Sequence, residues 1–332
     1  MGPPELALSE LTELASAHRL SSTFGTARGE PIVIVHLGSD DALPSPDTAR
    51  HELDIFPAVV VGIGSIDHPA KSFVDVLVEP ERVGGDLAAV VEAVTRHPLA
   101  STALCLLLRH GDERTIAAGL VAESTTYSML QGGPEFAAWL ASRHAVRTPE
   151  IDTPAVTVEL TGDSMVITLN RPSRHNAVDV DMSERLVEAL TEALAEPERQ
   201  IVLRGNGPSF SSGGDLAEFG SFTDPAASHA VRLSRSAGQL IAMMSDRVEA
   251  HVHGICFGAG IELPAFAGTI VAAADTRIAL PEVSLGLVPG AGGTVSVPRR
   301  IGRHRTALLA LTGESVDAGT AHRWGLVDHV QD

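Results

Sequence analysis

The stretch that decides the fold is residues 253–263, which read HGICFGAGIEL. A short apolar run ends there in a glycine-rich turn, and the residues after the turn predict a helix. Backbone N–H groups at a helix start have no partner within the helix, so this turn can bind an anion or a developing oxyanion. Glu262 falls in the first helical turn, where an acidic residue also suits the helix dipole alone. Both interpretations of Glu262 stay open at this point.

Two other glycine-dense turns stand on either side of that stretch. Residues 210–216 read FSSGGDL and residues 280–294 read LPEVSLGLVPGAGGT. Adjacent glycines let backbone N–H groups approach a ligand closely, although such loops are often plain turns. Glu282 lies among Leu, Val and Pro, an unusual setting for a carboxylate unless it is paired or reactive.

Other familiar chemistries are absent from the sequence. It contains no phosphate-binding GxxxxGK[ST], no GxSxG nucleophile turn, no HExxH, no CxxC and no GxGxxG after a strand. His251 and His253 alternate on a strand pattern without a nearby third ligand, so no metal site is expected.

The three turns form part of a longer collinear pattern. Residues 169–177 (LNRPSRHNA) precede them, and residues 311–314 (LTGE) and 317–328 (DAGTAHRWGLVD) follow. With the last two stretches counted as one motif, these five elements resemble in order and spacing the enoyl-CoA hydratase/isomerase (crotonase) superfamily over about residues 155–330. The resemblance implies an α/β fold of the ClpP/crotonase type, a spiral of ββα units. Residues 1–150 show no comparable match.

The resemblance implies acyl-coenzyme A thioesters as substrates and assigns roles to matching residues. The N–H groups of Gly214 and Ala259 would bind the enolate oxygen. Glu282 would act as acid and base at the α-carbon, and Glu262 would hold and activate water. Two carboxylates about 5 Å apart repel by roughly 3 kcal/mol at an effective dielectric near 20, so the pair should share a proton near neutral pH.

The same resemblance implies the other contacts. Substrate or coenzyme contacts are expected at Arg174, Ser212, Asp215, Leu216, Gly258 and Pro281. No metal or redox cofactor is expected, since coenzyme A enters as part of the substrate. A homo-oligomer, a trimer or hexamer, is the expected assembly.

Charge bears on how that coenzyme is held. With 24 basic against 42 acidic residues the formal net charge is −18, so an anionic coenzyme should need local arginines such as Arg171 and Arg174. A second basic group is expected at a solvated or subunit-facing helix start and comprises Arg299, Arg300, Arg303, His304 and Arg305.

Three departures from the family pattern stand out. Ser212 replaces an alanine, and Ala267-Gly268 stands where an aspartate is usual. Family members also continue beyond the position of Asp332 with helices that cover the acyl pocket. Residues 1–150 are therefore expected to provide that cover here, and the carboxyl-terminal helical region to be truncated.

The chain divides into two predicted domains, an αβ domain at 1–150 and the crotonase-like acyl-CoA domain at 151–332, with the boundary within 143–154. In the first, the apolar patterns predict helices over 5–18 and 86–96 and strands over 32–37, 57–62, 74–78 and 103–108. In the second they predict strands over 155–160, 165–169 and 201–204 and a helix over 182–195. The first domain could be a degenerate copy of the second, although any two αβ units look alike at this level.

Composition excludes several classes of protein. Hydrophobic residues make up 44% of the 332, enough for a sizeable core. Strong negative charge argues against nucleic acid or anionic membrane partners, and no apolar run approaches the roughly 18 residues of a membrane span. Because the start of the chain has no signal-peptide pattern and the two cysteines lie far apart, a reduced, cytoplasmic protein is expected.

The function favoured by these observations is hydration of a 2-enoyl-CoA, or the reverse dehydration. An enoyl-CoA isomerase or another acyl-CoA lyase of specialised metabolism would need only Glu282. A non-catalytic acyl-CoA-binding subunit remains the alternative from a different class.

Overall fold

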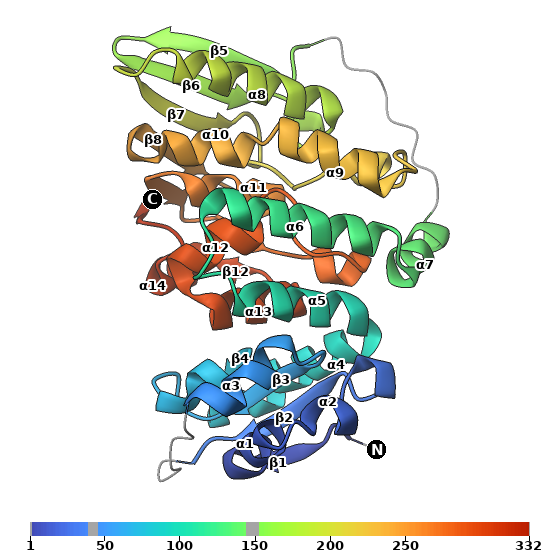
Figure 1. The fold of residues 1–332 in the computed structure, drawn as a ribbon. Coiled ribbons are helices and arrows are strands. Elements are labelled where there is room, and N and C mark those ends of the chain that lie inside the picture. Colours follow the sequence, from blue (N-terminus) through green and yellow to red (C-terminus); the bar gives the residue numbers. More distant parts are fainter. Residues whose placement is uncertain (1, 39–45, 144–152, 332) are drawn as a thin grey trace.

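A computed structural model describes residues 2–38, 46–143 and 153–331 of the chain. Its elements form an amino-terminal αβ region, a larger αβ region and a layer of helices between their sheets (Figure 1). Most of the predicted boundary at 143–154 lies outside the described residues.

The amino-terminal region is built on a four-stranded parallel sheet in the order β1-β2-β3-β4. Its strands are Glu5–Ala7, Ile32–His36, Val59–Ile63 and Val76–Val78. The helices α1 (Leu8–Ser16), α2 (Leu20–Thr23), α3 (Pro46–Ile55) and α4 (Ala88–Arg96) belong to the same region. The strands predicted over 32–37, 57–62 and 74–78 are thus confirmed, whereas the first residues of the predicted helix 5–18 form a strand.

Alternation along these strands separates two hydrophobic clusters. Val59 and Val61 point into the main core of the molecule, while Val60 points into a second cluster under α1. Successive strand residues face opposite sides, so a sheet covered on both faces reads as a continuous apolar run.

The larger region holds a six-stranded sheet in the order β13-β10-β8-β7-β6-β5 and a three-stranded sheet in the order β12-β11-β9. The β5–β6 and β11–β12 pairs are antiparallel, and the other pairs are parallel. The strands are β5 (Val156–Thr161), β6 (Ser164–Leu169), β7 (Gln200–Gly205), β8 (Val248–Val252), β9 (Ile255–Phe257), β10 (Thr269–Ala273), β11 (Arg277–Ala279), β12 (Val316–Asp317) and β13 (His329–Gln331). The strands predicted over 155–160, 165–169 and 201–204 are confirmed.

Seven helices of the described chain accompany these sheets. They are α8 (Val180–Leu194), α9 (Pro225–Ser234), α10 (Ala237–Met243), α11 (Ala259–Glu262), α12 (Gly293–Ile301), α13 (Arg303–Thr312) and α14 (Ala318–Trp324). The helix predicted over 182–195 corresponds to α8, whose Asp179 cap accepts a hydrogen bond from the Met182 N–H.

The helices α5 (Pro98–Arg109), α6 (Ile116–Gln131) and α7 (Pro134–Ser142) lie along the larger region (Figure 1). In particular, α5 packs on α12 and α13, and α6 packs on α9 and α12. The strand predicted over 103–108 is therefore wrong. Pro98 occupies the first helical turn of α5, a position that suits proline. Helix α5 is buried on nearly every side, so its sequence is a continuous apolar run, and hydrophobic periodicity cannot tell such a run from a strand. The hypothesis that residues 1–150 are a degenerate copy of the second domain loses a predicted strand at this segment.

Charged residues also join the two regions. Buried Asp75 pairs with Arg109 at 2.7 Å, and Arg303 of α13 lies 3.7 Å from Asp75 and donates to the Ser72 carbonyl. Burial alone would raise the pKa of Asp75, but the Arg109 guanidinium overrides it and holds that pKa below its ordinary value. Arg300 donates to the Ala265 carbonyl and forms an ion pair with Asp328. The prediction of a solvated or subunit-facing basic group is thus wrong for Arg300 and Arg303.

Candidate active site

The first glycine turn, at residues 211–214, lies directly against strand β9. Ser211 and Cys256 form an isolated parallel bridge, and the Phe257 N–H donates to the Ser211 carbonyl. Gly213 has a φ of +89°, and a Cβ there would lie 2.7 Å from the Phe257 carbonyl oxygen. Only glycine fits this contact. Within the described residues, the Gly214 N–H donates no hydrogen bond.

The second turn leads from β9 into the short helix α11. Gly258 turns the chain with a φ of +50°, and its N–H donates to the Ala279 carbonyl. The next N–H group, that of Ala259, is the first of the helix and has no acceptor in the described part of the chain. The two turns are adjacent, since Gly213 packs on Phe257 and Gly258, and Gly214 and Ala259 line the same cavity.

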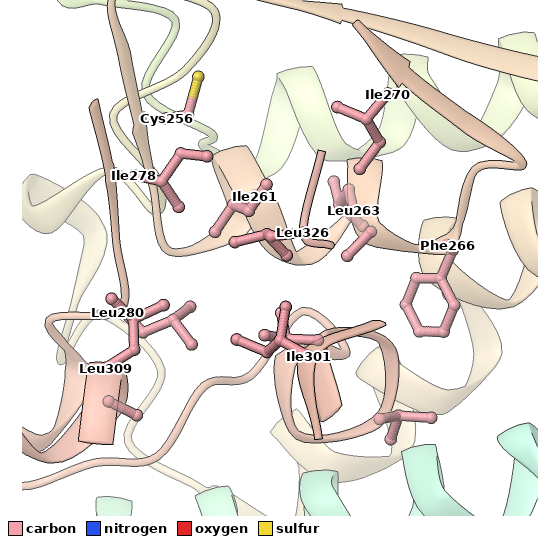
Figure 2. Packing of buried hydrophobic residues seen from close by; sticks show 14 of the residues in the cluster. Cys256, Ile261, Leu263, Phe266, Ile270, Ile278, Leu280, Ile301, Leu309 and Leu326 are labelled. Atoms are coloured by element: carbon pink, nitrogen blue, oxygen red, sulfur yellow. The ribbon is translucent and has the colours of Figure 1, made fainter. Parts of the chain in front are cut away.

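Apolar packing fixes α11 from behind. Figure 2 shows Ile261 and Leu263 in the same cluster as Ile301 and Leu326. These two side chains flank Glu262 in the sequence and anchor the backbone that carries it. The rigidity of the site therefore comes from the main hydrophobic core.

The two predicted glutamates converge on the second turn. Glu282 begins the 3₁₀ helix η9 (Glu282–Leu285), which follows β11, the strand paired with β9. A Cβ at Gly258 would lie 2.4 Å from Glu282 Oε1 and 3.7 Å from Glu262 Oε1. Exposure is 2% for Glu262 and 9% for Glu282. Two buried carboxyl groups thus face the same point, beside the Ala259 N–H.

Their surroundings differ in hydrogen bonding. Glu262 Oε2 accepts from the Ala291 and Gly293 N–H groups, both at 2.8 Å. Burial raises the pKa of Glu262 to about 7. Buried Glu282 Oε2 has no hydrogen-bond partner in the described chain, and burial together with the nearby Glu262 raises the pKa of Glu282 well above its ordinary range. Glu282 therefore holds a proton more readily than Glu262 does.

A third buried carboxylate, not anticipated from the sequence, lies beside them. Glu123 of α6 accepts from the Gly292 N–H at 2.7 Å, the Thr294 N–H at 2.8 Å and the Thr294 hydroxyl at 2.6 Å. Burial and the charge of Glu262 raise the pKa of Glu123 to about 8. Four consecutive N–H groups at the start of α12 therefore alternate between Glu262 and Glu123.

One sequence signal could have identified Glu123. It is the only charged residue among the sixteen of α6, IAAGLVAESTTYSMLQ. A lone carboxylate on an otherwise uncharged helix has to be exposed or paired with buried donors. Its donors lie about 170 positions away, so the sequence could not name them.

A cavity of about 290 Å³ opens beside these groups. Gly214, Ala259, Glu262 and Glu282 all line it, together with Tyr127 and Gln131 of α6 and apolar side chains that include Phe219, Phe222 and Val231. Helix α6 therefore forms one wall of the pocket, as expected for a cover provided by residues 1–150.

The other predicted contact residues lie around this cavity with different exposures. Asp215 lines it, but its carboxylate lies 3.1 Å from the Arg174 guanidinium and 3.6 Å from Arg171 and accepts from the Ala217 N–H. Leu216 is 45% exposed. Ser212 and Pro281 are half-buried, Gly258 is buried, and none of these three lines the cavity.

The described residues contain neither a candidate metal site nor a candidate membrane-spanning helix. No group of three or more His, Cys, Asp or Glu residues there could hold a metal ion. No described helix is long and apolar enough to cross a membrane.

Comparison with known families accounts for this arrangement. The family model described as enoyl-CoA hydratase/isomerase matches residues 161–331, just over half of the chain. The chain belongs to this crotonase family. Glu262, Glu282 and both free N–H groups lie within the match, whereas Glu123 and Tyr127 lie outside it.

Individual crotonase-family relatives agree with that assignment. A 2,3-dehydroadipyl-CoA hydratase of Escherichia coli is 35% identical over 170 residues, which are 50% of this chain and 65% of that protein. An enoyl-CoA isomerase/hydratase of Mycosarcoma maydis is 33% identical over 53% of this chain and 68% of its own. The crystal structure of an enoyl-CoA hydratase from Thermoplasma volcanium is 37% identical, with a TM-score of 0.51 over 54% of this chain and 73% of that one. The larger αβ region is therefore crotonase-like. The chain spans about two thirds of the length of the curated relatives that it matches.

Proposed function

We propose that the protein is an enoyl-CoA hydratase, adding water reversibly to a 2-enoyl-CoA thioester. The observation that carries the proposal is the convergence of Glu262 and Glu282 on Gly258, next to the free N–H of Ala259. Hydration needs a base for water and an acid for the α-carbon, and the two carboxyl groups differ in the way that these roles require.

The thioester oxygen would accept hydrogen bonds from the Gly214 and Ala259 N–H groups. Negative charge grows on that oxygen as water attacks the β-carbon, so fixed donors stabilise the transition state more than the substrate. Loss of one such donor typically costs about 3 kcal/mol of barrier. Because both donors belong to the main chain and sit on glycine-dependent turns, substitutions that move Gly213 or Gly258 would act on them.

The protons would move between water, the two glutamates and the substrate. Glu262, the more acidic of the pair, would take a proton from water as the water oxygen bonds to the β-carbon. Glu282 would deliver its proton to the α-carbon as the carbon–carbon π bond is lost. Each turnover leaves Glu262 protonated and Glu282 ionised, and proton exchange between them restores the starting state.

Binding of the coenzyme would use the surroundings of Arg174. Asp215 holds the Arg174 guanidinium at 3.1 Å, which orients it but also offsets its charge. We place Ser212, Leu216, Gly258 and Pro281 along the thioester and pantetheine path, by the family pattern. A homo-oligomer, trimer or hexamer, is part of the same proposal, and its mass in solution would test it.

Loss of enoyl absorbance with crotonyl-CoA and longer 2-enoyl-CoA thioesters tests the hydratase activity. The wild-type protein should show turnover, and the Glu262→Gln/Glu282→Gln double variant should not. Thioester binding without turnover by the wild-type protein would contradict the proposal and favour a non-catalytic subunit.

The second candidate is a double-bond isomerase. It is favoured by the commitment of one Glu262 oxygen to the Ala291 and Gly293 N–H groups, since an isomerase needs only one mobile carboxyl group, that of Glu282. Glu262→Gln separates the two activities, because it would abolish hydration and spare isomerisation of a 3-enoyl-CoA.

A further inference from the structure

One wall of the cavity carries a cation that the hydration chemistry does not use. Arg232 of α9 is half-buried and lines the same 290 Å³ cavity as Glu262 and Glu282. It is the one arginine among the described residues lining that cavity.

Within the described part of the chain, the Arg232 guanidinium contacts only neutral groups of α6. Its Nε donates to the Ser124 hydroxyl at 3.1 Å and its Nη1 to the Gln131 side-chain oxygen at 3.3 Å. Its Nη2 contacts the Ser124 carbonyl at 3.5 Å and the Ser128 hydroxyl. The carbon at its centre lies 4.7 Å from the centroid of the Tyr127 ring.

Arg232 therefore differs from the arginines on the other side of the site. Arg171 and Arg174 each pair with at least one aspartate, whereas Arg232 has no ion pair with any described carboxylate. In a chain with 42 acidic residues, a half-buried guanidinium without a carboxylate is notable, since removing a charge from water is unfavourable unless an opposite charge compensates.

The acidic groups nearby, including Glu218 of the same cavity, form no ion pair with Arg232 in the described chain. Glu123 directs both carboxylate oxygens at donors of residues 292–294, and burial raises its pKa, which disfavours its charged form. Burial raises the pKa of Glu282 and so favours its neutral form, and Glu262 accepts from the Ala291 and Gly293 N–H groups. The Tyr127 hydroxyl, beside Arg232, also forms no hydrogen bond within the described chain.

We propose that Arg232 binds a carboxylate at the far end of the substrate's acyl group, so that the substrates are 2-enoyl-CoA thioesters of dicarboxylic acids. This inference rests on the proposed function. The apolar side chains of Phe219, Phe222 and Val231 would contact the methylene groups, and the Tyr127 hydroxyl could donate to the same carboxylate. Arginine suits this role because its guanidinium stays charged, and one N–H of its Nη1 has no acceptor in the described chain.

The test compares 2-enoyl-CoA thioesters of equal carbon number with and without a terminal carboxylate. The wild-type protein should have a KM at least about tenfold lower for the dicarboxylic thioester, the effect of one charge-assisted hydrogen-bonded pair. Arg232→Met should raise that KM by roughly 10- to 100-fold and leave the KM for the monocarboxylic thioester within about threefold. Arg232→Lys should retain part of the preference.

Arg185→Met provides the matched control. Arg185 is an exposed arginine of α8 paired with Asp181, and its replacement should change neither KM. Equal KM values for the two substrates in the wild-type protein would overturn the proposal. An equal rise in KM for both thioesters with Arg232→Met would also overturn it. Such a result would mean that Arg232 only holds α9 against α6, which affects the two substrates alike.

A binding measurement separates this inference from the proposed function. If no 2-enoyl-CoA is hydrated, the hydratase proposal fails, and calorimetry with saturated dicarboxylic and monocarboxylic CoA thioesters then decides the role of Arg232. Tighter binding of the dicarboxylic thioester that Arg232→Met abolishes supports the inference. Equal affinities contradict it.

Discussion

Glu262 and Glu123 accept hydrogen bonds from alternate backbone N–H groups of residues 291–294, but they use their two carboxylate oxygens differently. Glu262, on the four-residue helix α11, gives one oxygen to the Ala291 and Gly293 N–H groups and leaves the other near Gly258 and Glu282. Glu123, on the sixteen-residue helix α6, commits both oxygens to the backbone and hydroxyl of residues 292–294. A carboxylate with a free oxygen in a cavity can react, whereas one with both oxygens occupied mainly positions its partners.

The largest expected effect follows from the free oxygen of Glu262. Glu262→Gln can keep its amide oxygen on the Ala291 and Gly293 N–H groups, so the melting temperature should stay close to that of the wild type. Loss of the base should lower kcat for hydration by about 10²- to 10⁴-fold. Steady-state kinetics with thermal unfolding of the same preparation checks both. A large loss of stability would show that Glu262 acts as Glu123 does.

The next largest effect is expected at the point where the carboxyl groups meet. Gly258→Ala adds a Cβ 2.4 Å from Glu282 Oε1 at a φ of +50°, so Glu282 must move. A displacement of about 1 Å in a catalytic group can cost roughly 100-fold in kcat. The matched control is Gly302→Ala, at another positive φ, where a Cβ meets no atom within 4 Å. Equal losses of activity in both variants would trace the effect to backbone strain.

Glu123→Gln tests the other side of the comparison. Its amide has to direct an NH₂ group at the Gly292 N–H or the Thr294 N–H, which leaves a buried donor unsatisfied. The free energy of unfolding should fall by about 1–3 kcal/mol, and kcat should fall by less than about tenfold. Denaturant unfolding and kinetics measure the two. If kcat fell as far as in Glu262→Gln with stability unchanged, Glu123 would have to be counted among the reacting groups.

The pH dependence of stability sharpens the same point. The pKa of Glu123 in the folded protein is about 8, raised from 4.5 chiefly by burial, so the folded state binds an extra proton between these values. Stability from this group is complete below about pH 4.5 and is lost as pH rises through about 8. Melting temperatures of the wild type should therefore fall from pH 5 to pH 8.5, and those of Glu123→Gln should fall less. Parallel curves would contradict the assignment.

The smallest effect is expected at the contact between the two regions. Arg303→Met removes the 3.7 Å approach to Asp75 and the bond to the Ser72 carbonyl, but Asp75 keeps Arg109. We expect a loss of about 1 kcal/mol of unfolding free energy and an unchanged kcat. A change in kcat would show that the amino-terminal sheet influences the active site as well as the stability of the chain.

Local sequence was sufficient for much of the site. Glycines at 213 and 258 are required by close backbone contacts, Glu262 follows its turn by four residues, and the strands β6, β7 and β9 read as apolar runs. These features depend on neighbours in the chain, and a few adjacent residues therefore predict them.

The sequence failed where long-range packing decides the outcome. Residues 103–108 read as a strand because α5 is buried on nearly all sides, which removes the helical periodicity. Arg300 and Arg303 read as a solvated group because their partners lie at Asp328 and Asp75, distant in the sequence.

By itself the sequence determined the family, the two glutamates and the glycine turns that carry the free N–H groups, because each is a local arrangement. Only the tertiary structure decided that α6 forms one wall of the pocket and that Glu123 and Glu262 accept from the same turn. It also decided that Arg232 lines the cavity without an ion pair to a described carboxylate. These facts follow from contacts between segments about 100 to 170 positions apart, which are set by how the helices pack.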